Sequence, residues 1–171
     1  MADLQDFNSI SAGLPAAQLR QRYAADGFLL LSGLIDADIS RTAAEVLVGL
    51  PGIDGRVEAL RPPAQYVADR GLVEHYARQD QALLACFSDA FIDTTAMLVD
   101  NPIAHRPDGV QTQILLESSR PWSQPNPHID GIPKDNRHKT FPGPYEIAFI
   151  IYLSDIQPQG GGTVGWPGSH Q

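Results

Sequence analysis

The stretch Y-E-I-A-F-I-I-Y-L, from Tyr145 to Leu153, is the strongest strand signal in this chain of 171 residues. A short apolar run of this kind is typical of a central strand that is covered on both faces. A central strand also needs a hydrogen-bonded neighbour along each of its edges. The stretch therefore predicts a β-sheet in the C-terminal part of the chain, and the fold depends on which segments are its neighbours.

Candidate neighbours lie on both sides of this stretch in the sequence. V-Q-T-Q-I-L-L (Val110–Leu116) is typical of a strand, and G-G-G-T-V-G-W (Gly160–Trp166) of a turn followed by another short strand. Earlier, F-L-L-L-S-G-L-I (Phe28–Ile35) predicts a short strand that is covered on both faces. Only about four or five strands are visible, whereas a closed or two-layered β domain usually has about seven or eight. We therefore expect a further C-terminal part or a partner to complete the sheet.

The N-terminal part of the chain is predicted to be mainly helical. Pro15 opens a first helix, since proline is tolerated in a first turn, and Asp26-Gly27 end it. Asp36 has the side chain of a helix N-cap, and the helix that it begins is expected to run to about Leu50.

A further helical region is predicted over residues 72–99, after an irregular stretch at residues 52–68. A break is expected near Ser88-Asp89, and Asn101-Pro102 close the region because the residue before a proline avoids the helical conformation. Helices first and strands afterwards are the order of an α+β protein. We expect one domain over residues 1–171.

Composition limits the classes of protein to which the chain can belong. Hydrophobic residues make up 43% and charged residues 19% of the chain, as in globular proteins. The formal net charge of -8 argues against binding to nucleic acid or to an anionic membrane surface. No apolar run approaches the length of a membrane span, and the N-terminus lacks the basic start and apolar core of a signal peptide. These features predict a soluble cytoplasmic protein with no membrane or nucleic-acid partner.

Three residues with reactive or ligating side chains are interpreted as structural. Cys86 is the single cysteine, so no intramolecular disulfide can form. It lies in the apolar run A-L-L-A-C-F, which favours a buried and inert thiol over a reactive one. His75 on a predicted helix and His105 in a predicted loop have no chemical neighbour in the sequence.

The sequence P-H-I-D-G (Pro127–Gly131) is the first candidate for chemistry. His-x-Asp alone is common by chance, so its meaning depends on its surroundings. In an extended segment, residues two apart point to the same face, so His128 and Asp130 can offer a nitrogen and a carboxylate oxygen to one point. Such a pair supplies two thirds of a 2-His-1-carboxylate triad, which holds Fe(II) and leaves coordination positions open. Structural zinc would require four ligands, usually with thiolates, and the chain has no such set.

Three groups of residues follow one another in a characteristic order. They are R-Y-A-A-D-G-F-L-L-L-S-G-L-I (Arg22–Ile35), P-H-I-D-G, and I-Y-L-S-D followed by G-G-G-T-V-G-W-P-G-S-H (Ile151–His170). In this order they resemble the phytanoyl-CoA dioxygenase family of Fe(II)- and 2-oxoglutarate-dependent oxygenases. That family has an N-terminal helix with D-G-F/Y and a strand, then a metal-binding H-x-D, then a strand, an acidic turn, a glycine run and P-G-S/T-H. No single element is specific, but the ordered set is fairly specific.

The resemblance implies a fold, a double-stranded β-helix (jelly roll) with the N-terminal helices packed on its outer sheet. It also implies that His128 and Asp130 bind Fe2+, that 2-oxoglutarate and dioxygen are co-substrates, and that a small organic substrate is hydroxylated. Halogenating relatives replace the metal-binding carboxylate with a small residue, so Asp130 argues against halogenation.

In that family a second histidine ligand follows P-G-S-H, and an arginine that grips 2-oxoglutarate comes about ten residues later. Both would lie beyond Gln171, so we expect the jelly roll of this chain to lack its last strands. His170 matches the P-G-S-H histidine, which is not a ligand in the family, and it is interpreted as a loop residue rather than as the third ligand.

Further candidates lie on segments that line the cavity in related enzymes. Gln111 and Gln113 alternate on the strand predicted at residues 110–116, where they either contact 2-oxoglutarate or face solvent. Thr163 and Trp166 follow the glycine run, and a structural role is the alternative for each. We assign Gln113 and Thr163 to 2-oxoglutarate binding. On the connections that flank the H-x-D segment, a surface position is favoured over a substrate contact for three residues: Trp122, His138 and Lys139.

Other classes of function remain open on the sequence alone. The chain could be a non-catalytic jelly-roll binding protein that has lost the distal histidine and arginine, although the retained His128 and Asp130 argue against this. A cupin-like metal isomerase or sugar-binding domain is a third class, but the sequence contains no motif that supports it. A histidine followed by an arginine in the coding sequence after Gln171 would favour the oxygenase.

Overall fold

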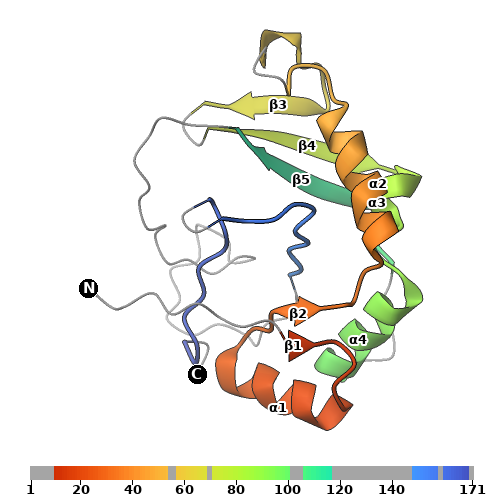
Figure 1. The fold of residues 1–171 in the computed structure, drawn as a ribbon, viewed down its shortest axis with the longest axis vertical. Coiled ribbons are helices and arrows are strands. Elements are labelled where there is room, and N and C mark those ends of the chain that lie inside the picture. The colour runs from red at the N-terminus through yellow and green to blue at the C-terminus, as the bar shows by residue number, and fades with distance from the viewer. Residues whose placement is uncertain are drawn as a thin grey trace, which may run out of the picture.

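The computed structural model describes residues 10–53, 57–68, 71–100, 106–116, 148–157 and 160–169. These residues form helices and two small sheets, so the predicted α+β class is confirmed (Figure 1). In this described part of the chain, the sheets do not close into a barrel. None of its helices combines the length with the apolar composition that a membrane span requires.

The first helix, α1, runs from Ala16 to Asp26, as the sequence predicts. Pro15 occupies the N-cap position, where its missing N–H removes no helical hydrogen bond. Gly27 ends the helix in a left-handed conformation with φ of 81° and donates its N–H to the carbonyl of Tyr23 at 2.9 Å. Leu19 carries the buried side of the helix, with 2% of its surface exposed.

A short parallel pair, β1 (Ile10–Ser11) with β2 (Leu31–Ser32), forms the smaller sheet. The strand predicted at residues 28–35 is therefore reduced to two residues. Gly33 adopts a φ of 76°, which turns the backbone out of the extended conformation directly after the pair. Leu30 is 39% exposed, so the expected coverage on both faces is wrong.

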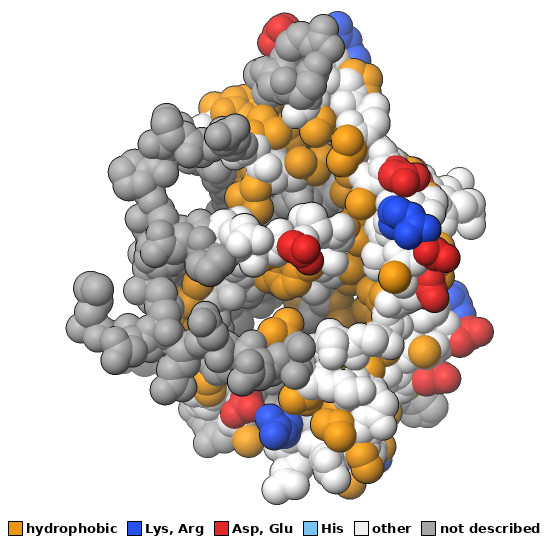
Figure 2. All heavy atoms as spheres, in the orientation of Figure 1, with side chains coloured by type: hydrophobic (Ala, Val, Ile, Leu, Met, Phe, Trp, Pro, Cys, Tyr) orange, Lys and Arg blue, Asp and Glu red, His pale blue; other side chains and the backbone are white. Residues whose placement is uncertain are grey.

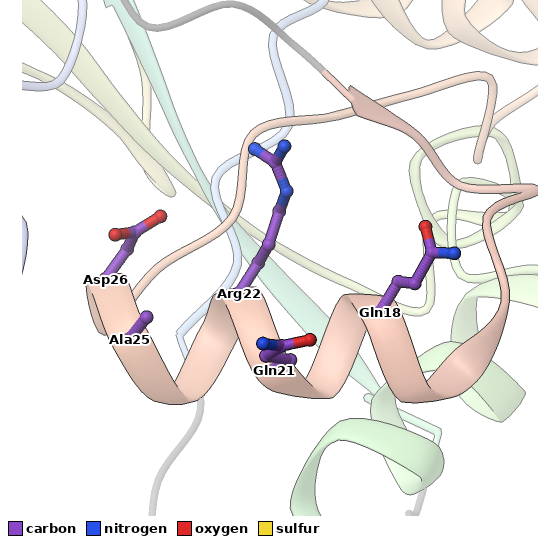
Figure 3. A pocket seen from close by; sticks show the side chains of 5 residues that line it. All are labelled: Gln18, Gln21, Arg22, Ala25 and Asp26. Atoms are coloured by element: carbon purple, nitrogen blue, oxygen red, sulfur yellow. The ribbon is translucent and has the colours of Figure 1, made fainter.

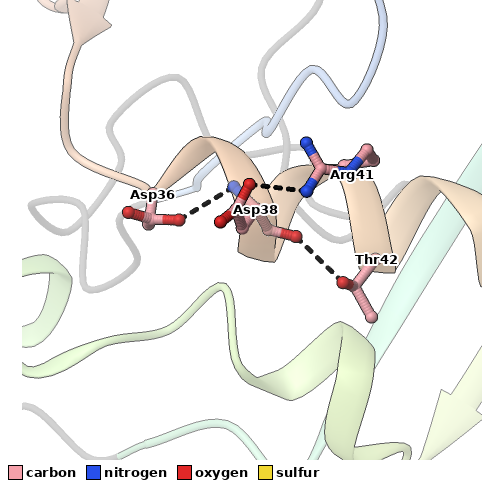
Figure 4. A network of polar contacts seen from close by, with 4 residues as sticks. All are labelled: Asp36, Asp38, Arg41 and Thr42. Atoms are coloured by element: carbon pink, nitrogen blue, oxygen red, sulfur yellow. Dashed lines mark hydrogen bonds and ion pairs between the residues drawn. The ribbon is translucent and has the colours of Figure 1, made fainter.

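The second helix, α2 (Ala37–Val48), begins at the predicted cap. The Asp36 carboxylate accepts the N–H of Asp38 at 2.8 Å, and the network of this first turn is drawn in Figure 4. Asp38 also forms an ion pair with Arg41 at 2.6 Å, and its carbonyl accepts the Thr42 hydroxyl at 2.9 Å. Both partners of the ion pair are exposed, so the pair adds little to stability.

The larger sheet has the order β3-β4-β5 with antiparallel neighbours. Its strands are β3 (Ala64–Val67), β4 (Leu72–Arg78) and β5 (Gly109–Leu115), and a short 3-10 helix (Val57–Ala59) precedes them. β5 confirms the strand predicted at residues 110–116. Figure 2 shows hydrophobic side chains at the surface over this sheet. The large hydrophobic side chains that this sheet exposes are those of Tyr66, Tyr76 and Leu115.

Two predictions made for the segments before β5 are wrong. Residues 52–68, expected to be irregular, contain the 3-10 helix and β3, and the helix expected to begin at Leu72 is instead the strand β4. Burial in β4 has a period of two, because Val73, His75 and Ala77 are buried on one face. Pairing with β3 on one side and β5 on the other gives this segment hydrogen bonds along both edges, which outweigh a local preference for helix.

Two helices follow β4, namely α3 (Gln81–Leu84) and α4 (Asp89–Val99). The break predicted near Ser88-Asp89 is confirmed, since the Ser88 hydroxyl caps α4 by accepting a backbone N–H of its first turn at 3.3 Å. The helix ends at Asp100, which is left-handed with φ of 52°. The expected terminator, Asn101-Pro102, lies outside the described residues.

The core lies between the inner face of the larger sheet and the helices α2 and α3, which lie side by side in Figure 1. Its buried members are Ala43 and Leu47 of α2, Ala77 of β4, Leu83 of α3 and Cys86 just after α3. Cys86 is 3% exposed, so its predicted burial is confirmed. Ile151 and Leu153 pack against the same cluster and bring the C-terminal part of the chain to the core.

Residues 148–153 belong to the stretch predicted as a central strand, but they form no strand in the structure. Their side chains alternate as a strand's would, with Ile150 at 62% and Tyr152 at 40% exposure between half-buried neighbours. However, none of their backbone groups hydrogen-bonds to another described residue. The prediction is therefore wrong for these residues, while residues 145–147 lie outside the described part. The turn predicted at residues 160–162 is present, with Gly161 at φ of 90°, but the short strand expected after it is not.

Candidate functional site

The two predicted metal ligands, His128 and Asp130, lie outside the described residues. The same holds for the other candidate positions Trp122, His138, Lys139, His105 and His170. Within the ranges that the structure does describe, no group of three His, Cys, Asp or Glu side chains could hold a metal ion. The site can therefore be built from the sheet and from residues 148–169, where the remaining candidates lie.

Gln111 and Gln113 both project from the outer face of β5, where they are exposed. The register pairs Gln113 with Glu74 of β4, and Gln65 of β3 stands on the other side of Glu74. The Gln65 amide donates to the Glu74 carboxylate at 3.3 Å. Opposite residues of an antiparallel pair share a face, so the three side chains form one polar row across the sheet.

Next to this row, Gln111 pairs with Tyr76 of β4. The Arg78 guanidinium lies 5.7 Å from the centre of the Tyr76 ring, in the range of a cation–π contact. We call these six side chains the polar sheet face: Gln65, Glu74, Tyr76, Arg78, Gln111 and Gln113. It carries both signs of charge together with amide and phenol groups, so it can hold a polar ligand of either sign.

Four members of the polar sheet face were not among the candidates from the sequence, and one of them, Gln65, lies on β3 in the stretch that was expected to be irregular. Glu74, Tyr76 and Arg78 lie on β4, which the sequence analysis assigned to a helix. In a helix Tyr76 would lie on a different face from Glu74 and Arg78, and none of the three would be paired with a residue of β5. The signal that identifies them is the alternation of β4, in which each of them is followed or preceded by a buried residue.

The glycine run reaches the end of the polar sheet face. A Cβ built on Gly161 would lie 2.9 Å from the Leu115 side chain, and Leu115 projects from the same face of β5 as Gln113. Gly161 also has a φ of 90°, which glycine adopts readily. The close approach of these two segments therefore depends on glycine at position 161. It places the glycine run, which Thr163 follows, next to β5, which carries Gln113.

Thr163 is held by Tyr152. The Thr163 N–H donates to the Tyr152 phenol oxygen at 2.8 Å, and the phenol donates to Thr163 Oγ1 at 2.7 Å. Both side chains are exposed. Thr163 was a candidate from its sequence, whereas Tyr152 was expected only as part of the apolar run of a central strand. The two residues tie residues 148–153 to the glycine run.

The W-P-G-S turn (Trp166–Ser169) packs on the D-G-F element (Asp26–Phe28) that follows α1. The Gly168 N–H donates to the Asp26 carbonyl at 3.0 Å. A Cβ on Gly165 would lie 2.9 Å from the Phe28 ring. Trp166 is half-buried and its carbonyl accepts the N–H of Ser169 at 3.1 Å, so the structure gives it a place in the turn. Figure 1 shows the C-terminal segment reaching the end of α1.

A hollow of about 410 Å³ lies along α1, lined by Gln18, Gln21, Arg22, Ala25 and Asp26 (Figure 3). Its described walls come from one helix face, and in the figure the Arg22 side chain extends away from the helix axis between those of Gln18 and Asp26. A surface groove with one cation, one anion and two amides selects no particular ligand. We give it no part in the function.

His75 lies on the inner face of β4 with 8% of its surface exposed. Its backbone carbonyl accepts the Thr112 hydroxyl at 2.9 Å, while its Nδ1 atom has no hydrogen-bond partner in the described structure. The expected helical position is wrong, but the buried position agrees with a structural role.

Comparison with known proteins adds no family to these observations. No family model, no curated protein and no solved structure matches the chain.

Proposed function

We propose that the chain is an Fe(II)- and 2-oxoglutarate-dependent dioxygenase related to the phytanoyl-CoA dioxygenase family, which hydroxylates a small organic substrate. In this proposal the two sheets and residues 148–169 are parts of a jelly roll. His128 and Asp130 are two ligands of Fe2+, and Gln113 and Thr163 contact 2-oxoglutarate. When bound there, Fe(II) and 2-oxoglutarate would supply the electrons that activate dioxygen, which is the oxidant.

The contact between the D-G-F element and the W-P-G-S turn carries the proposal. These two elements are far apart in the sequence, and both belong to the resemblance that suggested the oxygenase. The hydrogen bond from Gly168 to Asp26 and the packing of Gly165 on Phe28 place them against each other. Two short motifs that match by chance would have no reason to pack against each other.

The described residues also suit the co-substrate. The carboxylates of 2-oxoglutarate accept hydrogen bonds, and donors to them are offered by the Thr163 hydroxyl and by the amides of Gln111 and Gln113. Because Gly161 packs on Leu115, these donors lie on adjoining segments. Their part in the reaction is to bind and orient the co-substrate, and the polar sheet face offers contacts for the substrate.

The test is formation of succinate from 2-oxoglutarate by the full chain with Fe(II) under air. We expect His128→Ala and Asp130→Ala to lower the rate by more than about 100-fold, because loss of a ligand costs more than the 10- to 100-fold of an outer-sphere partner. His105→Ala, which removes a histidine interpreted as structural, is the control and should retain the wild-type rate.

Two results would contradict the proposal. Equal turnover by the wild type and by both ligand variants would show that His128 and Asp130 do not hold the reactive metal. Binding of 2-oxoglutarate without any succinate formation would instead favour the non-catalytic binding protein.

A further inference from the structure

Tyr152 and Thr163 are joined by two hydrogen bonds that share the phenol oxygen. The Thr163 N–H is a donor only, so at 2.8 Å the phenol oxygen must act as its acceptor. The phenol hydrogen then points to Thr163 Oγ1 at 2.7 Å. A phenol is a stronger hydrogen-bond donor than an aliphatic alcohol, which favours this direction over the reverse.

The direction of this bond determines whether the Thr163 hydroxyl can donate a hydrogen bond to a ligand. A threonine hydroxyl has one hydrogen to donate and two lone pairs that accept. Since one lone pair takes the phenol hydrogen, the hydroxyl's own hydrogen is left to donate away from Tyr152. Thr163 is exposed, so that hydrogen is accessible to a ligand.

The backbone around the pair is anchored on both sides. Gly161 packs on Leu115 before Thr163, and Gly165 packs on Phe28 after it. Next to Tyr152 in the sequence, Ile151 and Leu153 pack against the core. The hydroxyl of Thr163 is therefore held in one place as well as in one hydrogen-bonding direction.

We propose that Tyr152 is a positioning residue that sets Thr163 as a hydrogen-bond donor to a carboxylate oxygen of 2-oxoglutarate. A preset donor binds an anionic oxygen without reorganisation, and charge-assisted hydrogen bonds are stronger than neutral ones. The inference rests on the proposed function, since it takes the ligand from it. It adds a residue, Tyr152, and a direction for the hydrogen bond of Thr163.

The experiment measures the affinity of the full chain for 2-oxoglutarate by calorimetry with Mn(II) in place of iron, together with KM and kcat for succinate formation with Fe(II). Tyr152→Phe and Thr163→Val should each raise Kd and KM about tenfold, with kcat changed much less. Thr163→Ser keeps the hydroxyl and should bind as the wild type does. The double variant should bind no more weakly than Thr163→Val, because the two residues act through one hydrogen bond.

Tyr66→Phe is the control, because Tyr66 is 41% exposed and Tyr152 is 40% exposed. It should leave Kd unchanged. If the wild type binds 2-oxoglutarate and both Tyr152→Phe and Thr163→Val bind within twofold of it, the inference is overturned together with the Thr163 contact, and the proposed dioxygenase activity stands. Independent, additive losses in the double variant would also overturn it. If the wild type neither binds nor turns over 2-oxoglutarate, the proposed function fails and the inference fails with it.

Discussion

Burial is the main influence on the chemistry of the Cys86 thiol. The side chain is 3% exposed among Ala43, Leu47, Ala77 and Leu83, with no basic residue in that cluster. Desolvation by this apolar surrounding raises the pKa of the thiol above its ordinary value of 9.0, and a backbone hydrogen bond offsets part of the rise. Since the thiolate is the nucleophile, the residue is inert in the folded chain.

We expect Cys86 to react with a thiol reagent at pH 8 far more slowly in the folded chain than in urea. The folded chain must first open to expose a thiol that is both buried and protonated. Labelling followed by mass spectrometry measures both rates. Equal rates in the two conditions would show that the thiol is accessible in the fold.

The raised pKa of Cys86 also predicts a direction for stability against pH. The folded chain holds the thiol proton more tightly than the unfolded chain, so the contribution is complete below the pKa of the unfolded state and is lost as pH rises through the pKa of the folded state. Urea unfolding at pH 7 and pH 10 should therefore show a larger loss for the wild type than for Cys86→Ala. An identical loss in both proteins would contradict the shift.

At the scale of elements, β4 is the centre of the larger sheet, and Val73 is its most buried position, with 0% exposure. We expect Val73→Ala to lower the free energy of unfolding by about 2–3 kcal/mol, from lost apolar burial and the cavity left behind. The same substitution at Val48, which is 72% exposed at the end of α2, should change the free energy of unfolding by less than about 0.5 kcal/mol. Urea titration gives both values, and a similar cost at the two sites would mean that β4 is not buried as described.

The sequence predicts helix ends well where a single residue determines the local backbone conformation. Asp36 caps α2 where the sequence places a helix start, Ser88 caps α4 where the sequence places a break, and Gly27 ends α1 where the sequence places its end. In each of these cases a side-chain oxygen or a missing Cβ acts on its own turn, within a few residues. Such ends can be predicted without knowledge of distant contacts.

Segments whose conformation depends on neighbours are predicted less well. β4 alternates in burial, yet L-V-E-H-Y-A-R also suits a helix, and only its pairing with β3 and β5 decides between them. For residues 148–153 the error is the opposite one, because a strand was predicted and none is formed. The apolar run favours a strand, but no described residue forms backbone hydrogen bonds with it. Strand formation is a property of at least two segments, and one segment carries only half of the information.

At the scale of the whole molecule, two distant parts of the chain meet at the end of α1. A Cβ on Gly165 would lie 2.9 Å from Phe28, and Gly168 has a φ of 73°. We expect Gly165→Ala to cost about 1–3 kcal/mol by overpacking and Gly168→Ala about 1–2 kcal/mol by backbone strain. Thermal and urea unfolding measure both.

Gly13→Ala is the matched control for these two variants. Its Cβ would make an ordinary contact at 3.4 Å, so we expect a neutral or slightly stabilising effect. If all three variants unfolded alike, the W-P-G-S turn would not be docked on the D-G-F element.

The sequence by itself determined the α+β class, both ends of α1, the start of α2, the break before α4, the strand β5 and the burial of Cys86, because each follows from local turn chemistry or from apolar composition. It also named Gln113 and Thr163 as candidates. Only the tertiary structure showed that Glu74, Tyr76 and Arg78 share a face with Gln113, that Tyr152 holds Thr163, and that Gly165 and Gly168 dock beside Phe28 and Asp26. These are contacts between residues far apart in the chain or in separate segments, and they exist only once strand register and packing bring those segments together.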